Sequence, residues 1–219
     1  MRDDFGVLIL THGRADNVKT VKSLQKAGYT GKWYIVIDDE DDQEDEYRRI
    51  YGERVIQFCK EERARITDVG DTSKERRCII FARNEAFAIA RKLGLRYFIE
   101  LDDDYNNFEY LEKIGEKLKH TKIKQIEKVF EAMIAFLDVS NAKSVAMAQG
   151  GDLLGGVKDP RWKEQLLRKA MNSFIFRTDN PANFVGRINE DVNTYVTGGQ
   201  RGELFFTTLR VMLNQEQTQ

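Results

Sequence analysis

The chain has 219 residues, of which 41% are hydrophobic and 32% are charged. This supplies enough apolar material for one sizeable core and excludes disordered and fibrous classes. Thirty-five Lys and Arg residues against 36 Asp and Glu residues give a net charge of −1, so a polyanion partner must meet a local patch rather than a whole-molecule field. Apolar runs such as residues 7–10 fall far short of the ~18 residues of a membrane span. The acidic N-terminus and only two cysteines, Cys59 and Cys78, favour a reducing cytosol, with a single bridge left open.

Short apolar runs alternate with amphipathic helical segments through the first half of the chain. The predicted strands are residues 7–10, 33–37, 55–58 and 97–101. The predicted helices lie near residues 16–27, 44–51 and 78–93 and end at Gly28, Gly52 and Gly94. This alternation predicts an α/β fold with a mostly parallel central sheet and helices on both faces.

The second half begins with a predicted helix over residues 121–138 and then becomes rich in strands. The strands predicted there are residues 144–148, 173–176 and 204–207, which suggests a mixed sheet or a small β layer. With two prolines, no linker and no repeat, residues 1–219 are expected to form a single domain.

Three consecutive acids, Asp102, Asp103 and Asp104, come directly after the fourth predicted strand. Ligands of open parallel sheets bind beyond the carboxyl ends of the strands. Residues two apart project to the same side, so Asp102 and Asp104 are expected to act together, and Mg²⁺ is commonly held by one or two carboxylates plus substrate phosphates. The alternative is a solvated acidic turn that caps the next helix.

Other strand ends carry charged or polar residues that are expected to flank this triplet. The first strand ends in Thr11, His12, Gly13 and Arg14, and the second ends in Asp38 and Asp39. The two histidines, His12 and His120, have no zinc-ligand spacing. Three arginines, Arg76, Arg77 and Arg83, precede or open a helix and are candidates to neutralise a diphosphate, although exposed arginines usually only carry surface charge.

Glu190 and Asp191 stand at the predicted start of a short helix. A carboxylate within hydrogen-bond reach of a sugar-accepting hydroxyl accepts its proton in the transition state. The structural alternative is a helix cap, but a second carboxylate set beside a metal-nucleotide site is what metal-assisted group transfer requires.

The sequence resembles glycosyltransferases of the GT-A fold, and within them the TET-associated glycosyltransferases of bacteriophages. The matching segments are VLILTHGR at 7–14, IVIDDED at 35–41, CIIFARNEAFAIARKLGLRYFIELDDDY at 78–105 and GRINEDVNTYV at 186–196. The resemblance implies a nucleotide-binding half at about 1–105 and an acceptor-binding half at about 106–219. It also implies a cytoplasmic protein, in the host cytoplasm for a phage-encoded one.

The resemblance further implies roles for individual residues. Asp102 and Asp104 would form the DxD motif that holds Mn²⁺ or Mg²⁺ on a UDP-sugar donor. Asp38 or Asp39 would contact the base, and Thr11, Arg14, Arg83 and Asp103 would line the same pocket. Asp191 or Glu190 would deprotonate the acceptor hydroxyl, and the single displacement would invert the anomeric configuration. The implied acceptor is a hydroxymethylated pyrimidine, such as hydroxymethylcytosine, in phage DNA.

One departure from the family pattern concerns the C-terminal segment. Many members of this fold supply a further metal ligand there, often histidine, and no histidine occurs after His120. Relatives are also expected to continue beyond residue 219. We therefore expect a naturally short or truncated chain with incomplete closure over the donor.

Three alternatives stay open on the sequence alone. They are a protein or glycan acceptor for the same chemistry, a catalytically idle fold that serves as a binding module, and a nucleotidyl transfer reaction. The candidates to track DNA phosphates or to stack on an extruded base are Lys113, Lys117, Lys119, Lys122, Lys124, Lys158, Arg161, Lys163, Arg168, Lys169, Tyr105 and Trp162. A charged helix face is the commoner explanation for such lysines.

Overall fold

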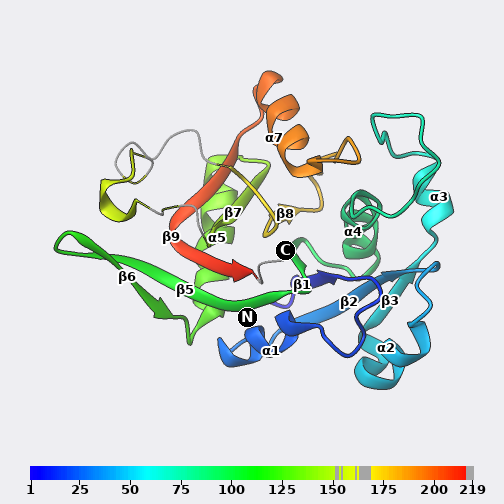
Figure 1. Ribbon diagram of the computed structural model, residues 1–219, viewed down its shortest axis with the longest axis horizontal. Coiled ribbons are helices and arrows are strands. Elements are labelled where there is room, and N and C mark those ends of the chain that lie inside the picture. The colour runs from blue at the N-terminus through cyan, green and yellow to red at the C-terminus, as the bar shows by residue number, and fades with distance from the viewer. Residues whose placement is uncertain (151–152, 154, 161, 163–168, 216–219) are drawn as a thin grey trace.

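The structure is a computed structural model that describes residues 1–150, 153, 155–160, 162 and 169–215. A single nine-stranded sheet runs through these residues, with strand order β3-β2-β1-β4-β8-β7-β9-β5-β6. Figure 1 shows helices on both sides of this sheet, with β3 and the β5–β6 hairpin toward opposite ends. The fold is therefore the α/β class that the sequence predicts.

The element boundaries agree with the sequence most closely in the first half. The strands are β1 (Phe5–Leu10), β2 (Lys32–Asp38), β3 (Val55–Phe58), β4 (Tyr97–Asp102), β5 (Tyr105–Ile114), β6 (Lys117–Lys122), β7 (Ser144–Gln149), β8 (Ile175–Arg177) and β9 (Phe205–Gln215). The α-helices are α1 (Lys19–Lys26), α2 (Glu44–Tyr51), α3 (Lys60–Ala64), α4 (Ile80–Lys92), α5 (Ile126–Ser140) and α7 (Glu190–Gln200), and short 3₁₀ turns cover Gly52–Arg54 and Gly156–Lys158.

The sheet is mixed, although most of its strands point the same way. The first four strands pair in parallel in the order β3-β2-β1-β4. The short strand β8 is antiparallel to both β4 and β7, so β7 again points along β4, and β9 pairs in parallel with β7. Strand β5 is reversed between β9 and β6. Within the described residues, β1, β2, β3 and β4 therefore bring their carboxyl ends to one edge of the molecule.

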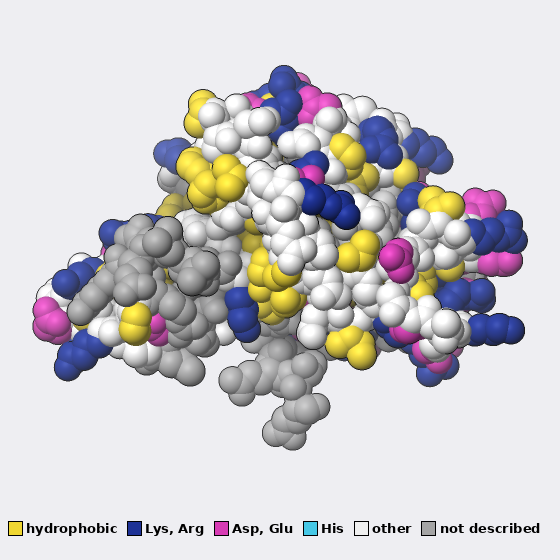
Figure 2. Space-filling view, turned by 90° about the horizontal axis from the view of Figure 1, so that it is seen from above, with side chains coloured by type: hydrophobic (Ala, Val, Ile, Leu, Met, Phe, Trp, Pro, Cys, Tyr) yellow, Lys and Arg dark blue, Asp and Glu magenta, His cyan; other side chains and the backbone are white. Residues whose placement is uncertain are grey.

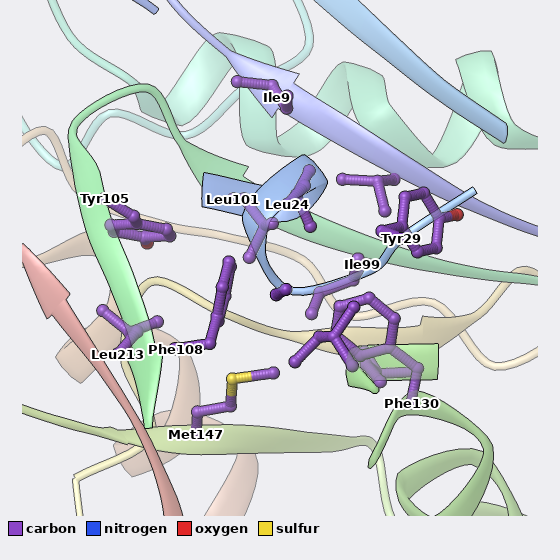
Figure 3. Packing of buried hydrophobic residues seen from close by; sticks show 14 of the residues in the cluster. Ile9, Leu24, Tyr29, Ile99, Leu101, Tyr105, Phe108, Phe130, Met147 and Leu213 are labelled. Carbon is purple, nitrogen blue, oxygen red and sulfur yellow. The ribbon is translucent and has the colours of Figure 1, made fainter. Parts of the chain in front are cut away.

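Two apolar layers cover the two faces of the sheet because alternate side chains of each strand point to opposite sides. On one face, Val21 and Leu24 of α1 and Phe130 of α5 pack against Ile9 and Ile99. In Figure 3, Leu24 of α1, Phe108 of β5, Phe130 of α5 and Met147 of β7 lie together in this layer. The other face is covered by α4, whose Phe81 and Phe87 belong to the second cluster. Burial on both sides holds the strand ends, and the loops after them, in fixed positions.

The principal error in the predicted elements is the β5–β6 hairpin. The segment expected to open a helix at residue 121 is instead edge strand β6, and α5 begins only at Ile126. Strand β6 has the sequence KLKHTK and is almost wholly exposed, so it carries no apolar period that marks a strand. Strand β9 also extends to Gln215, well beyond the predicted residues 204–207, because it pairs on both sides with β7 and β5.

Cys59 and Cys78 are both free thiols, so the single bridge left open by the sequence is not formed. No helix in the described part of the chain combines the length and apolar character that crossing a bilayer requires.

Candidate active site

A cavity of about 530 Å³ opens at the carboxyl ends of β1, β2, β3 and β4. Eight of the ten site residues predicted from the sequence line it, and they are Thr11, Arg14, Asp38, Arg83, Asp102, Asp103, Asp104 and Glu190. Asp39 and Asp191 do not. Residues more than 80 positions apart in the sequence meet here because β1 lies directly between β2 and β4.

Both carboxylate oxygens of Asp103, the middle acid of the triplet, accept hydrogen bonds from the loop after β1. The Thr11 hydroxyl donates to Oδ2 of Asp103 at 2.6 Å, and the Arg14 guanidinium donates to Oδ1 at 3.0 Å. Burial raises the pKa of Asp103, and these two contacts lower it again in part. Asp103 therefore ties the first loop to the fourth strand, with both oxygens already occupied.

Asp104 differs because one of its oxygens has no partner. Its Oδ2 accepts a hydrogen bond from the Gln215 side-chain amide at 3.1 Å, at the end of β9. Its Oδ1 is buried and has no hydrogen-bond partner within the described residues. A buried carboxylate oxygen without a partner is costly unless something binds there. Asp104 thus lines the cavity and keeps one buried carboxylate oxygen without a partner among the described residues.

Arg83 is the centre of a buried cluster of carboxylates. From the first turn of α4 it reaches Asp102 at 3.1 Å, Glu190 at 3.1 Å and, more distantly, Glu100 at 3.5 Å. Its Nη2 nitrogen also lies 3.4 Å from Oδ1 of Asn172. The guanidinium is almost completely buried, so it is a structural tie between α4, β4 and α7 rather than an exposed cation.

The carboxylates around Arg83 outnumber it, and their pKa values reflect this. Burial, together with the neighbouring acids and despite Arg83, raises the pKa of Asp102 to about 6. Burial likewise raises the pKa of Glu100 to about 8, and one Glu100 oxygen has no hydrogen-bond partner among the described residues. The surrounding acids in turn raise the pKa of Arg83 above its ordinary value, against the effect of burial. This end of the cavity therefore carries excess negative charge.

The opposite end of the cavity is built on β2 and β3, and its charges are paired. Asp38 at the end of β2 contacts Lys60 Nζ at 3.1 Å and His12 Nδ1 at 3.1 Å. Lys60 is buried and also lies 3.8 Å from Glu40. The backbone N–H of Gly13 donates to buried Asp41 at 2.8 Å. Acceptor and donor groups thus stand side by side in a partly apolar recess that includes Phe58.

The two predicted site residues that lie outside the cavity have other local roles. Exposed Asp39 accepts the backbone N–H of Lys60 at 2.9 Å; burial acts to raise its pKa, but hydrogen bonds from Lys60 and Cys59 bring it below the ordinary value. Asp191 is buried and accepts the backbone N–H of Val192 at 2.7 Å in the first turn of α7. Of the two acids at that helix start, only Glu190 lines the cavity.

Four residues of this site are not among those predicted from the sequence: Lys60, Glu100, Asn172 and Gln215. Lys60 stands two residues after the third predicted strand, so the same strand-end rule would have found it. Glu100 interrupts the apolar run 97–101, and an acid within a buried strand is itself a signal. Asn172 and Gln215 belong to segments whose position is set by distant pairing, which no local pattern reveals.

The structure corrects the expected roles of two aromatic residues. Tyr105 is fully buried, and its hydroxyl donates to the backbone oxygen of Asn172. Trp162 is also buried, with the Arg210 guanidinium 4.9 Å from its ring centroid. Neither ring offers an open face on which an extruded base can stack.

The residues present fit a divalent cation that a substrate helps to bind. No group of three or more His, Cys, Asp or Glu side chains in the described part of the chain is arranged to hold a metal by itself. Mg²⁺ is usually held by only one or two carboxylates and completed by phosphates and water. The partnerless oxygen of Asp104, with Asp102 lining the same cavity, matches that requirement.

Solved structures similar to this fold include glucosyl-3-phosphoglycerate synthase from Mycobacterium tuberculosis. Its complex with Mn²⁺, UDP-glucose and phosphoglyceric acid has a TM-score of 0.56 and 11% identity, covering 98% of this chain and 72% of that one. Its complex with Mn²⁺, UDP and phosphoglyceric acid has a TM-score of 0.55 and 10% identity, covering 98% and 71%. At such identities the likeness concerns the fold alone.

A CMP-2-keto-3-deoxy-manno-octonic acid synthetase complexed with CTP is also similar, with a TM-score of 0.50 and 9% identity, covering 96% of this chain and 90% of that one. No curated protein matches the sequence significantly. Similar folds thus occur in enzymes that catalyse different reactions, so the fold alone does not identify the reaction of this chain. A model of the TET-Associated Glycosyltransferase family matches residues 5–219, so the chain belongs to this family of glycosyltransferases.

Proposed function

We propose that this glycosyltransferase is metal-dependent and moves a sugar from a UDP-sugar to a hydroxyl group with inversion at the anomeric carbon. The observation that carries the proposal is the partnerless buried oxygen of Asp104, in one cavity with Asp102 and Glu190. A metal ligand set and a separate carboxylate are the two parts that this reaction class requires.

Asp104 and Asp102 are the residues proposed to hold Mn²⁺ or Mg²⁺. When bound, the cation supplies Lewis-acid stabilisation of the departing diphosphate. Gln215 orients Asp104 through its other oxygen, and Arg83 orients Asp102. Support also comes from the structural neighbour whose crystals contain Mn²⁺ with UDP-glucose.

The paired end of the cavity is proposed to bind the uracil base. Uracil presents an acceptor oxygen next to an N–H donor, and the adjacent Lys60 ammonium and Asp38 carboxylate offer the complementary donor and acceptor. His12, held between Asp38 and Asp41, would keep the Asp38 carboxylate in place.

Glu190 is proposed as the base that accepts the proton of the acceptor hydroxyl. Its Oε1 is held by Arg83 at 3.1 Å, and no hydrogen bond to Oε2 occurs within the described residues. One oxygen is therefore fixed and the other is free to face a substrate, which suits a general base. The side chain of Asp191 accepts a hydrogen bond from the backbone N–H of Val192, so Asp191 is better suited to stabilising the start of α7.

The acceptor we propose is the hydroxymethyl group of a 5-hydroxymethylpyrimidine in DNA. Family membership supports this proposal, because the resemblance to the phage members implies that acceptor. A protein or glycan hydroxyl is the alternative acceptor for the same chemistry.

The surface offers only limited support for a DNA acceptor. Lys113, Lys117, Lys119 and Lys122 are exposed on the β5–β6 hairpin, but Glu112 lies opposite Lys119 and Glu109 opposite Lys122. Figure 2 shows Lys and Arg side chains spread around the visible face, with hydrophobic side chains between them. Arg161, Lys163 and Arg168 of the second expected patch lie outside the described residues, while Lys158 and Lys169 of that patch are exposed.

The proposal is tested by incubating the protein with UDP-sugars, Mn²⁺ and duplex DNA that contains 5-hydroxymethylcytosine. Mass spectrometry of the digested nucleosides should reveal a hexosylated base, and chelation of the metal should abolish it. Unmodified DNA and the variant Lys74→Ala, which changes an exposed residue outside the cavity, serve as controls. If no UDP-sugar or other sugar nucleotide is consumed with Mn²⁺ or Mg²⁺, the proposed function is wrong.

A further inference from the structure

Three arginines stand near the start of α4, and the structure separates their roles. Arg83 is buried among the carboxylates of Glu100, Asp102 and Glu190. The side chain of Arg76 forms an ion pair with Glu40. Arg77 lines the cavity and forms no ion pair or side-chain hydrogen bond within the described residues. Among the three, Arg77 is the cation that remains available to a ligand.

The loop that carries Arg77 is held in place on both sides. The Arg77 backbone N–H donates to the Glu75 carboxylate at 2.9 Å. Arg187 reaches into the same loop, where it donates to Asp71 at 2.9 Å and to the backbone oxygens of Ser73 and Glu75. Arg187 lies three residues before Glu190, so the loop is tied to the segment that positions the proposed base.

The charge balance of the cavity shows why an available cation matters. The other arginine and lysine side chains that line it already have partners: Arg14 contacts Asp103, Lys60 contacts Asp38, and Arg83 contacts Asp102 and Glu190. A diphosphate that enters this acidic cavity meets carboxylates whose charge is only partly neutralised. A guanidinium donates two parallel hydrogen bonds to phosphate oxygens, so it is well suited to offset that repulsion.

We propose that Arg77 binds the diphosphate of the nucleotide-sugar donor and offsets the charge that develops on it during transfer. This inference rests on the proposed function and adds a substrate-contacting residue to it. In the transfer step the anomeric C–O bond to the diphosphate breaks, and its electron pair stays on the phosphate oxygen. A lone pair of the acceptor oxygen forms the new C–O bond, and the acceptor proton passes to Glu190. In this proposal, the Arg77 guanidinium binds the phosphate oxygen that gains the charge.

The test compares how strongly variants bind UDP and uridine, which differ only in the diphosphate. Arg77→Ala removes the cation, Arg77→Lys retains a charge without the forked geometry, and Lys74→Ala removes an exposed charge from the same loop. Binding is measured by calorimetry or ligand-observed NMR, first in EDTA, so that a metal does not mask the effect, and then with Mn²⁺. Thermal melting of each variant checks that it is folded.

Arg77→Ala should weaken UDP binding about tenfold or more, as expected for loss of a charge-assisted hydrogen bond, and should leave uridine binding unchanged. Arg77→Lys should lie between wild type and Arg77→Ala, and Lys74→Ala should match wild type. In turnover with a UDP-sugar, Arg77→Ala should also lower kcat at saturating donor, because the contact strengthens as the leaving group gains charge.

The outcomes separate this inference from the proposed function. If wild type binds UDP and Arg77→Ala binds it equally well, Arg77 has no such role and the proposed function stands. An equal loss of UDP and uridine affinity would also overturn the inference, because it reveals general damage to the pocket. If wild type binds none of ADP, CDP, GDP, UDP and dTDP with or without Mn²⁺, both proposals are wrong.

Discussion

The two ends of the cavity are built from the same kinds of side chain but differ in charge balance. At the β2–β3 end, the Asp38 carboxylate is paired one to one with the Lys60 ammonium. At the β4 end, Asp102, Glu100 and Glu190 surround the single guanidinium of Arg83, and Asp104 keeps a partnerless oxygen. The first end suits an uncharged base, and the second suits a cation. In the proposed function, charge balance rather than the number of acids distinguishes the end that binds the base from the end that binds the metal.

The comparison is tested most severely by Asp104→Asn. Loss of a ligand charge at the imbalanced end should lower kcat about a thousandfold or more, because the cation that stabilises the leaving group is no longer held. Asp103→Asn, whose parent carboxylate is already fully hydrogen-bonded, provides the contrast and should lose less. Initial rates over a range of Mn²⁺ concentrations measure both variants. Equal losses of kcat would show that Asp103 and Asp104 do not have the different roles that the geometry indicates.

Glu190→Gln should lower transfer by about 10²–10⁴-fold, as expected for a lost general base, while donor binding stays intact. Asp191→Asn should retain most of the activity, because its parent side chain faces the backbone of α7. Rates of transfer to the acceptor, measured beside the affinity for UDP, separate the two. A larger loss in Asp191→Asn than in Glu190→Gln would reverse the proposed assignment.

Arg83→Met should reduce the free energy of unfolding by about 3–5 kcal/mol, because removal of one partner leaves buried carboxylates uncompensated. Arg14→Met, which breaks the pair between half-exposed Arg14 and buried Asp103, should cost less, because the Thr11 hydroxyl still donates to Asp103. Denaturant unfolding in EDTA measures both. A similar cost for both variants would mean that the imbalanced end is not held together by Arg83.

The stability of the protein should fall as pH rises from about 5 to about 8. The pKa of Glu100 is raised from 4.5 to about 8 in the folded protein, so in that window the folded state binds a proton that the unfolded state has released. Stability then decreases with pH, with a slope of up to about 1.4 kcal/mol per pH unit from this one group. Chemical unfolding across the pH range should show this slope in wild type and a flatter profile in Glu100→Gln. An unchanged profile in the variant would remove Glu100 as the cause.

Lys60→Ala should have the smallest effect, and it acts at the balanced end. We expect KM for a UDP-sugar to rise about tenfold with a smaller change in kcat, since contacts to the base are the same in the ground and transition states. Lys74→Ala is the control. A fall in kcat with unchanged KM would place Lys60 with the reacting groups instead.

The sequence predicts well which residues meet at the carboxyl ends of the first four strands, because the signals there are local. Residues 7–10, 33–37, 55–58 and 97–101 are short buried runs, and the loop after each run lies at the same edge of a parallel sheet. The predicted site residues Thr11, Asp38 and Asp102 meet for this reason. Lys60, which was not predicted, obeys the same rule.

The second half could not be predicted in the same way because its positions depend on distant pairing. Strand β5 leaves the acid triplet and pairs with β9, about a hundred residues later, and with the polar edge strand β6. This pairing brings Gln215 to Asp104, although neither residue belongs to a local pattern that predicts the contact. Which of Glu190 and Asp191 lines the cavity depends on how the first turn of α7 is oriented, and sequence spacing does not define that orientation.

The direct pairing of β4 with β8 limits how this enzyme can open. Because Tyr97, Phe98 and Ile99 pair with Arg177, Phe176 and Ile175, the segments on either side of the active site share one uninterrupted sheet. A hinge between the two halves would have to break hydrogen bonds at the centre of that sheet. In the proposed function, admission of the donor and release of the nucleotide therefore depend on the loops at the strand ends. The rates of those steps should respond to changes in the loops rather than to changes in the sheet.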